Sequence, residues 1–561
     1  MMNKSKRRLI YAIAALVMLL LVNFISSKIY KRFDLTQDQR YTLSNAALQT
    51  LDAVDSPLVI DVFLEGDFPS EFRRLRDETR QIIEEFAVYN DNISVNFINP
   101  LEDEKNRDRN LQQLSQRGLQ PFQISIKESG KTSQELIIPW ALASYNGQTV
   151  IIPLIKNKIG STDRELVNSS IQNLEYAFAD AFEKLVKPKQ KKIAILRGNG
   201  QLADIYIADF LKTLGEHYFL APFTLDSIAN TPQKTLSELK SYDLIISAKP
   251  SKAFSEQEKY ALDQFSMNGG KSLWLTERVI MDRDSLLNND GRAVALMKDL
   301  NLGDFFFKYG VRINPVIVND LYSAPITLAI GEGNNTQFQP LQWQYSPLAA
   351  SNPNHPITTN LDPIKFDFAS QIDTLKNTVE KTILLRSSQL TKLEGVPKEI
   401  NLDVVTQEPK PETYTKPNQT LAVLLEGQFN SVYKNRIKPF NTKDDLTESK
   451  PTKMIVIADG DIIKNEVVRN QPQELGFEFL TKRTFGNKEF LLNAVNYLLN
   501  DDGLINIRTK EVKLAFLDSN KIEAEKTKWQ LINIALPLIV LGVFGLIFNF
   551  FRRKHYGKKR V

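Results

Sequence analysis

Two long apolar runs near the ends interrupt an otherwise mixed pattern of hydrophobic and polar positions. Residues 9–25 contain seventeen positions without a charge, and residues 529–551 contain twenty-three. A membrane-spanning helix needs about 20 apolar residues, with a range of about 17–25. We therefore expect one transmembrane helix over residues 9–27 and a second over residues 529–551. A cleaved signal peptide is the alternative for the first run.

Between these runs, residues 28–187 have the pattern of an α/β module. Apolar residues first form a short β-rich run and then recur at helical spacings of three and four. This β-α-β, then β-β-α, order predicts a thioredoxin-like layer. The predicted elements are strands over 58–64 and 93–100, a helix around 75–89, a β-meander over 122–155 and a helix around 167–182.

Residues 188–510 have the pattern of a second α/β module, followed by a juxtamembrane linker over 511–528. Short apolar strands alternate with helices, and Ser255 forms a capping box with Glu258. Such alternation predicts a mainly parallel sheet. An irregular insertion over about 281–450 interrupts it and includes a predicted mobile loop, rich in Pro and Thr, over 395–420. The predicted elements are strands over 192–196, 242–250, 271–275 and 453–461 and helices over 202–214, 255–268 and 489–499.

Basic residues flank both apolar runs on their outer sides. Neither short tail, residues 1–8 or residues 552–561, contains an acidic side chain. Since positively charged flanks stay in the cytoplasm, we expect a two-pass membrane protein with both termini cytoplasmic and an extracytoplasmic body. The residues that carry this topology are Lys4, Lys6, Arg7, Arg8, the interfacial Trp529, Arg552, Arg553, Lys554, Lys558, Lys559 and Arg560.

The net charge changes sign when the two tails are left out of the count. The chain has 71 basic and 66 acidic residues, a formal net charge of +5. Without the ten basic residues of the tails, 61 basic residues remain and the net charge of the body is −5. A mildly acidic body has no electrostatic footprint for nucleic acid. We therefore expect the lipid bilayer, and no nucleic acid, among its partners.

The scarcity of cysteine and histidine excludes several kinds of site. The chain has no cysteine, which excludes disulfides, thiol nucleophiles and lipid attachment through cysteine. Its three histidines are His217, His355 and His555, and the last lies in the C-terminal tail. A three-histidine zinc site therefore cannot form in the body. We expect no catalytic residue, no metal and no cofactor, with His217 and His355 in structural or surface positions.

Two turns after predicted strands are candidate ligand sites. Gly198, Asn199 and Gly200 connect a strand to a helix, where backbone N–H groups can hold an anion or a sugar. The turn lacks the further residues of a dinucleotide fingerprint or a P-loop, so a structural turn is favoured. Asp459 and Asp461 end another strand, where paired acids can perform acid–base chemistry or bind Mg²⁺ or Ca²⁺. Turn formation and helix capping are the favoured alternative there.

Trp343 and Tyr345 are a third candidate site, an aromatic pair in the insertion. Their rings can stack on a sugar or on the side chain of a partner. Packing in a core or under a loop is the more common role of such residues, so both interpretations stay open.

The order of several segments resembles a known family. These segments are FDLTQDQRYTLS, LVIDVFLEGDFPSEFRRL, RGNG, DLIISAKP, FSEQEKYALDQFSMNGGKSLWL, ADGD and FGNKEFLLNAVNYLLNDDGLI. Together they resemble the gliding-motility-associated ABC transporter auxiliary protein of Bacteroidetes, often labelled its substrate-binding component. The resemblance covers essentially the whole chain and implies an ABC permease subunit and, through it, a cytoplasmic ATPase subunit as partners.

The resemblance also implies a fold for the second module, which looks like the doubly wound α/β fold of class I glutamine amidotransferases. Enzymes of that fold need a nucleophilic cysteine with a histidine, and this chain has no cysteine. Amidotransferase activity is therefore not implied. The expected fold class is α/β, with two transmembrane helices, a thioredoxin-like first module and an amidotransferase-like second module.

The expected function is that of a non-enzymatic auxiliary or binding subunit of an inner-membrane ABC transporter associated with gliding motility. It would couple the permease and the ATPase to periplasmic envelope components. Two anchors fit a subunit held beside its permease better than a free binding protein or a lipoprotein. One alternative is an envelope scaffold that binds cell-wall sugar or protein without transport. Another is an envelope hydrolase that uses carboxylates such as Asp459 and Asp461.

Overall fold

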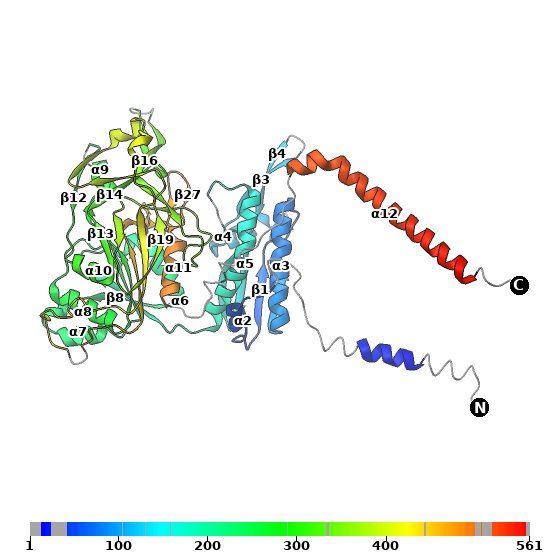
Figure 1. The fold of residues 1–561 in the computed structure, drawn as a ribbon, viewed down its shortest axis with the longest axis horizontal. Helices are drawn as coiled ribbons and strands as arrows, with labels where there is room; N and C mark the ends of the chain where they lie inside the picture. The colour runs from blue at the N-terminus through cyan, green and yellow to red at the C-terminus, as the bar shows by residue number, and fades with distance from the viewer. Residues whose placement is uncertain are drawn as a thin grey trace. The chain divides into compact units, whose positions relative to one another are not determined.

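The chain separates into two compact units, residues 1–511 and residues 512–561 (Figure 1). A computed structural model describes residues 13–23, 42–103, 105–128, 131–156, 159–288, 290–331, 336–442, 445–499, 507 and 519–556. The topology residues Lys4, Lys6, Arg7, Arg8, Lys558, Lys559 and Arg560 lie outside the described residues.

The first module is built on a four-stranded sheet with the order β2-β1-β5-β6. β1 pairs in parallel with β2 and antiparallel with β5, which pairs antiparallel with β6. These strands are β1 (Leu58–Val62), β2 (Ile93–Phe97), β5 (Trp140–Tyr145) and β6 (Gln148–Pro153). The predicted meander is split, because β3 (Phe122–Glu128) and β4 (Lys131–Ile137) form a hairpin of their own.

Helices bury their apolar stripes against this sheet. Phe86 of α3 meets Phe178 and Phe182 of α5, and the ring centroids of Phe86 and Phe182 lie 5.2 Å apart. Both helices follow the predicted apolar spacing. α4 was not predicted, because it buries only Leu114 and so has almost no apolar stripe. The helices are α2 (Asn45–Leu51), α3 (Ser70–Tyr89), α4 (Arg107–Gln116) and α5 (Asp163–Val186).

The second module contains the predicted parallel sheet, with the strand order β8-β7-β9-β10-β23. Four of its strands are short apolar runs that are mainly buried, as expected when helices cover a sheet from both sides, whereas the edge strand β8 is largely exposed. They are β7 (Lys192–Arg197), β8 (Phe219–Thr224), β9 (Leu244–Ala248), β10 (Lys271–Leu275) and β23 (Thr452–Ile457).

Helices cover both faces of this sheet and form two apolar cores. One core joins the sheet to α6 (Ala208–His217) and α11 (Asn487–Leu499). The other joins it to α7 (Pro232–Leu239), α8 (Glu256–Met267) and α10 (Gly303–Tyr309). The predicted capping box is confirmed, since Ser255 and Glu258 exchange hydrogen bonds at the start of α8. α6 begins later than predicted, after a 3₁₀ helix over Asp204–Tyr206.

The predicted irregular insertion is more regular than its sequence pattern indicates. Part of it continues the central sheet beyond β23 in the antiparallel order β22-β19-β16-β15. These strands are β15 (Ser323–Ile330), β16 (Gln337–Ser351), β19 (Glu380–Arg386) and β22 (Thr420–Gly427). The segment predicted as a mobile loop, 395–420, forms β21 (Lys398–Asn401) and 3₁₀ helices over Leu402–Thr406 and Pro411–Thr413.

The sheets and helices described above confirm the predicted mixed α/β class for the described part of the body. The remaining elements of the second module are shorter. These elements are β11 (Val279–Ile280), α9 (Arg283–Asn288), β12 (Arg292–Met297), β13 (Val311–Asn314), β14 (Val316–Asp320), β17 (Ile364–Lys365), β18 (Gln371–Thr374), β20 (Thr391–Gly395), β24 (Val467–Val468), β25 (Gln471–Pro472), β26 (Phe477–Glu478) and β27 (Arg483–Thr484).

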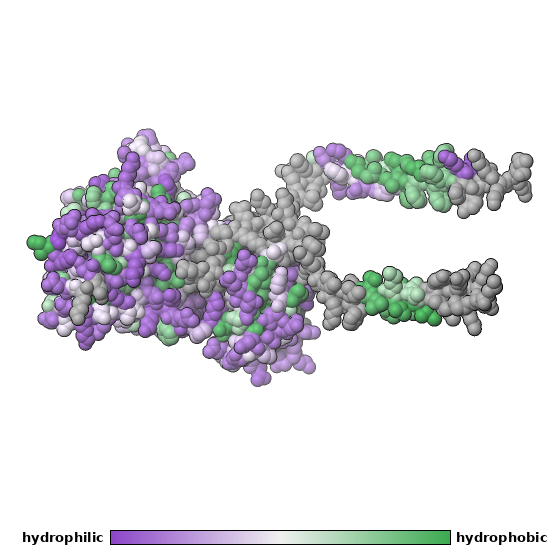
Figure 2. All heavy atoms as spheres, turned by 60° about the horizontal axis from the view of Figure 1, so that its bottom comes forward, coloured by the Kyte–Doolittle hydropathy of each residue, from purple (hydrophilic) through white to green (hydrophobic). Residues whose placement is uncertain are grey.

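The second unit contains the helix α12 (Ser519–Tyr556). Its stretch Ala524–Lys554 is the one segment among the described residues that is long and apolar enough to cross a membrane. Figure 2 shows its hydrophobic surface bounded by hydrophilic ends. The helix includes Trp529, Arg552, Arg553 and Lys554 and begins inside the predicted linker. Of the predicted first span, residues 13–23 form a short apolar helix, and the rest lies outside the described residues.

Candidate functional site

The candidate site lies at the carboxyl edge of the parallel sheet, where ligands of open α/β sheets commonly bind. Four of the connections that leave the sheet at this edge carry residues of the site. Gly198 directly follows β7 and Lys249 directly follows β9, whereas Glu277 and Asp459 lie two residues beyond the ends of β10 and β23. The two predicted turns therefore share one edge of the sheet, as the pattern of alternating strands and helices implies.

The glycine turn is filled by its own surroundings. The Asn199 carbonyl accepts hydrogen bonds from the backbone N–H groups of Ser251 and Lys252, at 3.0 and 2.9 Å. A side chain at Gly198 would meet Asp226, and one at Gly200 would collide with Ser251. Asn199 itself is only 5% exposed. This packing supports the structural-turn interpretation.

The predicted acids Asp459 and Asp461 join Glu277 in a carboxylate cluster. One oxygen from each of the three side chains lies within 4.8 Å of the others. Asp459 is fully buried, and its two oxygens accept hydrogen bonds from the backbone N–H groups of Asp461 and Asp367, both at 2.7 Å. The Gly460 N–H donates to Glu277 at 3.0 Å. The turn around Asp459 is thus held by its own carboxylates.

Two lysines supply the positive charge of this cluster. Lys249 Nζ lies 2.5 Å from Asp461 Oδ2 and 3.9 Å from Glu277 Oε1, and Lys298 Nζ lies 2.7 Å from Glu277 Oε1. Lys249 has a left-handed backbone, with φ of 52°, a conformation that is uncommon for a side chain of this kind. Its ammonium thus lies within ion-pair distance of two of the three carboxylates that could otherwise hold a metal ion.

If all three carboxylates and both lysines were ionised, this buried cluster would carry a net charge of −1. Burial, with the charges of Asp461 and Glu277, raises the pKa of Asp459 well above its usual value. Burial also raises the pKa of Asp461, although Lys249 opposes that shift. Burial lowers the pKa of Lys249, but Asp461 and Glu277 outweigh burial and raise it overall. The cluster therefore favours one bound proton.

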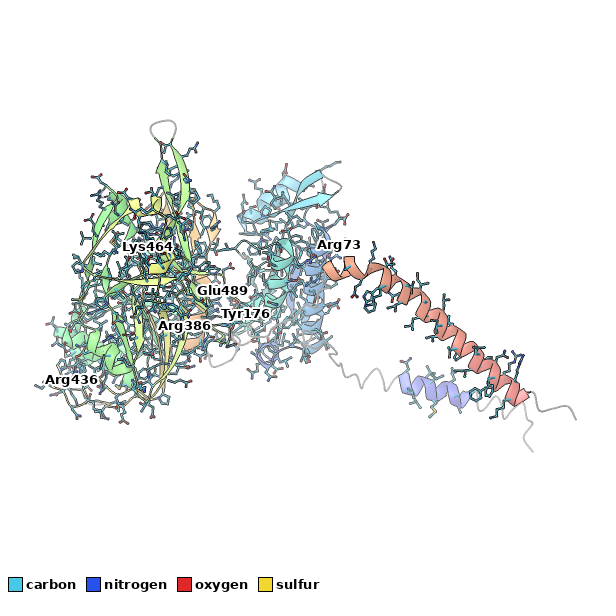
Figure 3. The ribbon with its side chains drawn as sticks, turned by 45° about the horizontal axis from the view of Figure 1, so that its top comes forward. Arg73, Tyr176, Arg386, Arg436, Lys464 and Glu489 are labelled. Carbon is cyan, nitrogen blue, oxygen red and sulfur yellow. The ribbon has the colours of Figure 1, made fainter. Side chains whose placement is uncertain are left out.

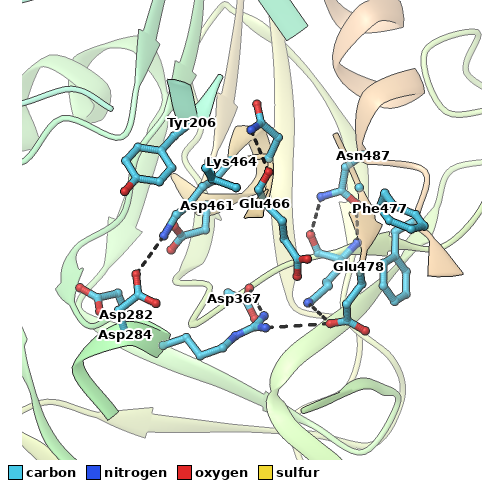
Figure 4. A pocket seen from close by; sticks show the side chains of 16 residues that line it. Tyr206, Asp282, Asp284, Asp367, Asp461, Lys464, Glu466, Phe477, Glu478 and Asn487 are labelled. Carbon is cyan, nitrogen blue, oxygen red and sulfur yellow. Dashed lines mark hydrogen bonds and ion pairs between the residues drawn. The ribbon is translucent and has the colours of Figure 1, made fainter. Parts of the chain in front are cut away.

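A pocket of about 470 Å³ opens beside the cluster, between the connection after β23 and the segments around β17 and β26. Figure 4 shows Asp461, Lys464 and Glu466 in its wall, with Asp282 and Asp284 on one side and Glu478 and Asn487 on the other. The position of Lys464 within the second module can be followed in Figure 3. The volume suits a small molecule.

Asp367 anchors the floor of this pocket. Its carboxylate pairs with Arg283 at 2.9 Å and accepts a hydrogen bond from Ser346. Burial alone would raise the pKa of Asp367, but Arg283 and Lys365 lower it to about 2. Asp367 therefore stays ionised and holds Arg283 in place.

Trp343 and Tyr345 lie in a separate apolar cluster under the insertion. Trp343 is fully buried and Tyr345 is 4% exposed, and both pack against Phe368. The Tyr345 hydroxyl donates to Glu394 at 2.8 Å. Neither residue lines the charged pocket. Burial favours the packing interpretation and gives no surface on which a sugar could stack.

The two body histidines have structural surroundings. His355 Nδ1 accepts a hydrogen bond from the Ile357 N–H at 3.2 Å, and burial lowers the pKa of His355 to about 4. Burial also lowers the pKa of His217, which lies 3.9 Å from Asp180. Neither is among the residues that line the charged pocket.

Several residues of the site were not predicted. Lys249 lies near the end of the predicted strand 242–250, and Glu277 lies two residues after the predicted strand 271–275. The rule that carboxyl ends share an edge would therefore have found both residues. Lys298, Asp367 and Glu478 come from connections whose positions depend on the tertiary fold. No local signal marks them.

The fold and the site define an α/β protein with a charged sheet edge and a separate helix fit to cross a membrane. Residues 190–494, more than half of the chain, match the family of ABC transporter auxiliary proteins described as "ABC-type uncharacterized transport system". The chain belongs to this family. Residues 37–144 match a second family, a domain of unknown function.

Two further similarities cover much of the chain. A protein of Borreliella burgdorferi described as "Uncharacterized protein" is 20% identical over 558 residues, which are 98% of each chain. Among solved structures, "mmIFT52 N-terminal domain" is 13% identical with a TM-score of 0.31 and covers 55% of this chain and 99% of its own. The first similarity extends over nearly the whole length of both chains.

Proposed function

We propose that this protein is a non-enzymatic auxiliary subunit of an inner-membrane ABC transporter associated with gliding motility. In this role it couples the permease and the cytoplasmic ATPase to periplasmic envelope components. The observation that carries the proposal is the family match over more than half of the chain. The apolar helix α12 supports it, because a subunit with its own membrane helix stays beside its permease.

The proposed topology has two passes, over residues 9–27 and 529–551, with both termini in the cytoplasm and the body in the periplasm. The apolar helix at residues 13–23 and the basic tails support this arrangement. In α12, Arg552, Arg553 and Lys554 directly follow the apolar stretch, where the positive-inside rule places a cytoplasmic end.

The specific folds of the modules are part of the proposal. The order β2-β1-β5-β6, with one parallel and two antiparallel pairings, supports a thioredoxin-like first module. The parallel order β8-β7-β9-β10-β23, with helices on both faces, supports an amidotransferase-like second module. Without cysteine, neither module has the thiol that redox or amidotransferase chemistry needs.

The surroundings of Asp459 and Asp461 support a structural role for these acids. A general acid or base must reach the substrate with its carboxylate. Both oxygens of Asp459 accept backbone hydrogen bonds inside the protein, and Asp461 is paired with Lys249. A chain in which both acids are replaced, Asp459→Asn with Asp461→Asn, should keep its permease and ATPase partners if it folds. Hydrolysis of an envelope substrate by the wild-type chain that is lost in this folded variant would favour the hydrolase.

Co-purification from native membranes tests the proposal. The full chain, solubilised in mild detergent, should retain an ABC permease and an ATPase in fixed ratio. The matched control replaces residues 529–551 by an unrelated Leu/Ala run of the same length, which keeps membrane insertion but removes specific helix contacts. It should lose the permease.

Two outcomes would contradict the proposal. Absence of any permease in the pull-down would remove the transporter role. Full gliding function of the Leu/Ala variant, without bound permease, would instead favour an envelope scaffold that acts without transport.

A further inference from the structure

The charged pocket beside the carboxylate cluster has more acidic than basic side chains in its wall. Its acids number six and its bases three. The acids are Asp282, Asp284, Asp367, Asp461, Glu466 and Glu478. A pocket with this surplus attracts cations and repels anions.

Every base in the wall already has an acidic partner. The three ion pairs are Arg283 with Asp367 at 2.9 Å, Lys365 with Glu478 at 2.9 Å, and Lys464 with Asp284 at 3.5 Å. An anionic ligand would have to break one of these pairs. The unpaired charges in the pocket wall are therefore negative, and they favour a cationic ligand.

Three of the acids keep acceptor capacity. Glu466 has no ion pair with another described residue, and one of its oxygens accepts the Phe479 N–H at 2.9 Å. Asp282 is likewise without an ion pair among the described residues, and its Oδ1 accepts hydrogen bonds from Ser285 at the start of α9. The third is Asp461, whose side chain is only 9% exposed.

The Oδ1 atom of Asp461 is the strongest evidence that the pocket binds a hydrogen-bond donor. Oδ2 of this carboxylate pairs with Lys249, but Oδ1 is buried and receives no hydrogen bond from the described residues. A buried carboxylate oxygen without a donor costs free energy unless a ligand supplies one. Since Asp461 lines the pocket, a molecule bound there can supply that donor.

We propose that the pocket binds a small organic cation that carries primary ammonium groups, with Asp461 Oδ1 as the anchor and Glu466 and Asp282 as further acceptors. An ammonium group matches these acceptors because it combines positive charge with three N–H donors. The cavity, at about 470 Å³, holds a molecule rather than a bare ion. A metal ion fits less well, because Lys249 Nζ already lies between Asp461 and Glu277.

This inference rests on the proposed function in that it names the ligand class of a binding subunit. Binding itself needs no permease. A failed titration would therefore overturn the ligand assignment alone, whereas a failed co-purification would overturn the transporter role alone.

Titration calorimetry of the detergent-solubilised full chain tests the inference. The probes are 1,4-diaminobutane, tetramethylammonium, Mg²⁺ and inorganic phosphate. The diamine should bind one site per chain. Tetramethylammonium carries the same type of charge without N–H donors, so it should bind about 10-fold more weakly or not at all. Mg²⁺ and phosphate should not compete.

Isosteric variants locate the site. Glu466→Gln and Asp282→Asn each remove one charge but keep the local hydrogen-bond acceptor, and each should weaken diamine binding about 10-fold. Asp461→Asn should weaken it further, with folding checked by tryptophan fluorescence. If that variant does not fold, the double variant of Glu466→Gln and Asp282→Asn carries the test. Glu399→Gln, an exposed acid outside the pocket, is the matched control and should bind normally.

The inference is overturned by any of three results. The first is no diamine binding by the wild-type chain. The second is equal binding by wild type and the folded pocket variants. The third is competition by Mg²⁺ or phosphate, which would assign the pocket to a metal ion or an anion instead.

Discussion

At the scale of single residues, the carboxylate cluster shows how a buried site balances its charge. Asp459 is fully buried beside two other acids, and Lys249 and Lys298 supply only two positive charges. A proton on the cluster removes the remaining charge, which explains the raised pKa of Asp459. The left-handed backbone of Lys249 fits this account, because strained residues persist where the surrounding structure holds them.

The raised pKa of Asp459 makes stability depend on pH. The folded state holds a proton that the unfolded chain releases near the ordinary value of 3.8. This contribution is complete below that value and is lost as pH rises through the folded pKa. Urea unfolding between pH 4 and pH 8, followed by the buried Trp274 and Trp343, should show stability falling with a slope of up to about 1.4 kcal/mol per pH unit.

Asp459→Asn removes this slope. At low pH the variant should be less stable than wild type by about 1–3 kcal/mol, because the amide cannot accept both backbone hydrogen bonds. The difference should shrink as pH rises. The exposed substitution Glu399→Gln should leave the wild-type slope unchanged. A slope that persists in Asp459→Asn would assign the proton to another member of the cluster.

At the scale of elements, the two capping boxes show which helix starts are specified locally. Ser255 Oγ accepts the Glu258 N–H at 3.2 Å at the start of α8, and Thr162 Oγ1 accepts the Glu165 N–H at 3.3 Å at the start of α5. The first was predicted from the sequence, since the pattern lies within four residues. Start signals of this kind do not depend on the rest of the fold.

Ser255→Ala should destabilise the protein by about 1 kcal/mol, with a range of about 0.5–2, because it leaves helix N–H groups without an acceptor. Urea unfolding measures the change. Ser255→Gly is the matched control, since glycine is a tolerated N-cap and should cost only a few tenths of a kcal/mol. Equal stability of the alanine variant and wild type would show that water or Asn199 replaces the cap.

At the scale of the whole molecule, the absence of cysteine makes the proposed topology directly testable. Single cysteines can be placed in the tails, as Ser5→Cys and Gly557→Cys, and in the body, as Lys234→Cys, whose native side chain is 74% exposed. A membrane-impermeant maleimide should label the body in intact spheroplasts. It should label the tails only after permeabilisation, because we propose that both lie in the cytoplasm.

The cysteine-free wild type provides a clean background for this experiment. Labelling of Ser5→Cys without permeabilisation would contradict the first membrane pass. Labelling of Gly557→Cys under the same conditions would contradict the orientation of α12. A body cysteine that reacts only after permeabilisation would place the body in the cytoplasm.

The sequence alone predicted the local features of this protein. Periodicity and short-range hydrogen bonds predicted four strands of the parallel sheet, three of the helices that cover it, the long C-terminal apolar helix and the capping box at Ser255. The edge strand β8 and the helices α7 and α10 were not predicted. The edge position of Asp459 and Asp461 followed as well, because carboxyl ends of parallel strands meet at one edge. Each of these depends on contacts between residues close in sequence or on one general rule of topology.

Only the tertiary structure decided what surrounds those residues. The insertion joins the central sheet through β22, and Lys298 and Asp367 reach the carboxylate cluster from inside it. Ser251 closes the glycine turn, and Trp343 is buried rather than displayed. These outcomes depend on pairings between segments far apart in sequence, whose positions no local pattern encodes, so the charge and the shape of the pocket became visible only in the folded chain.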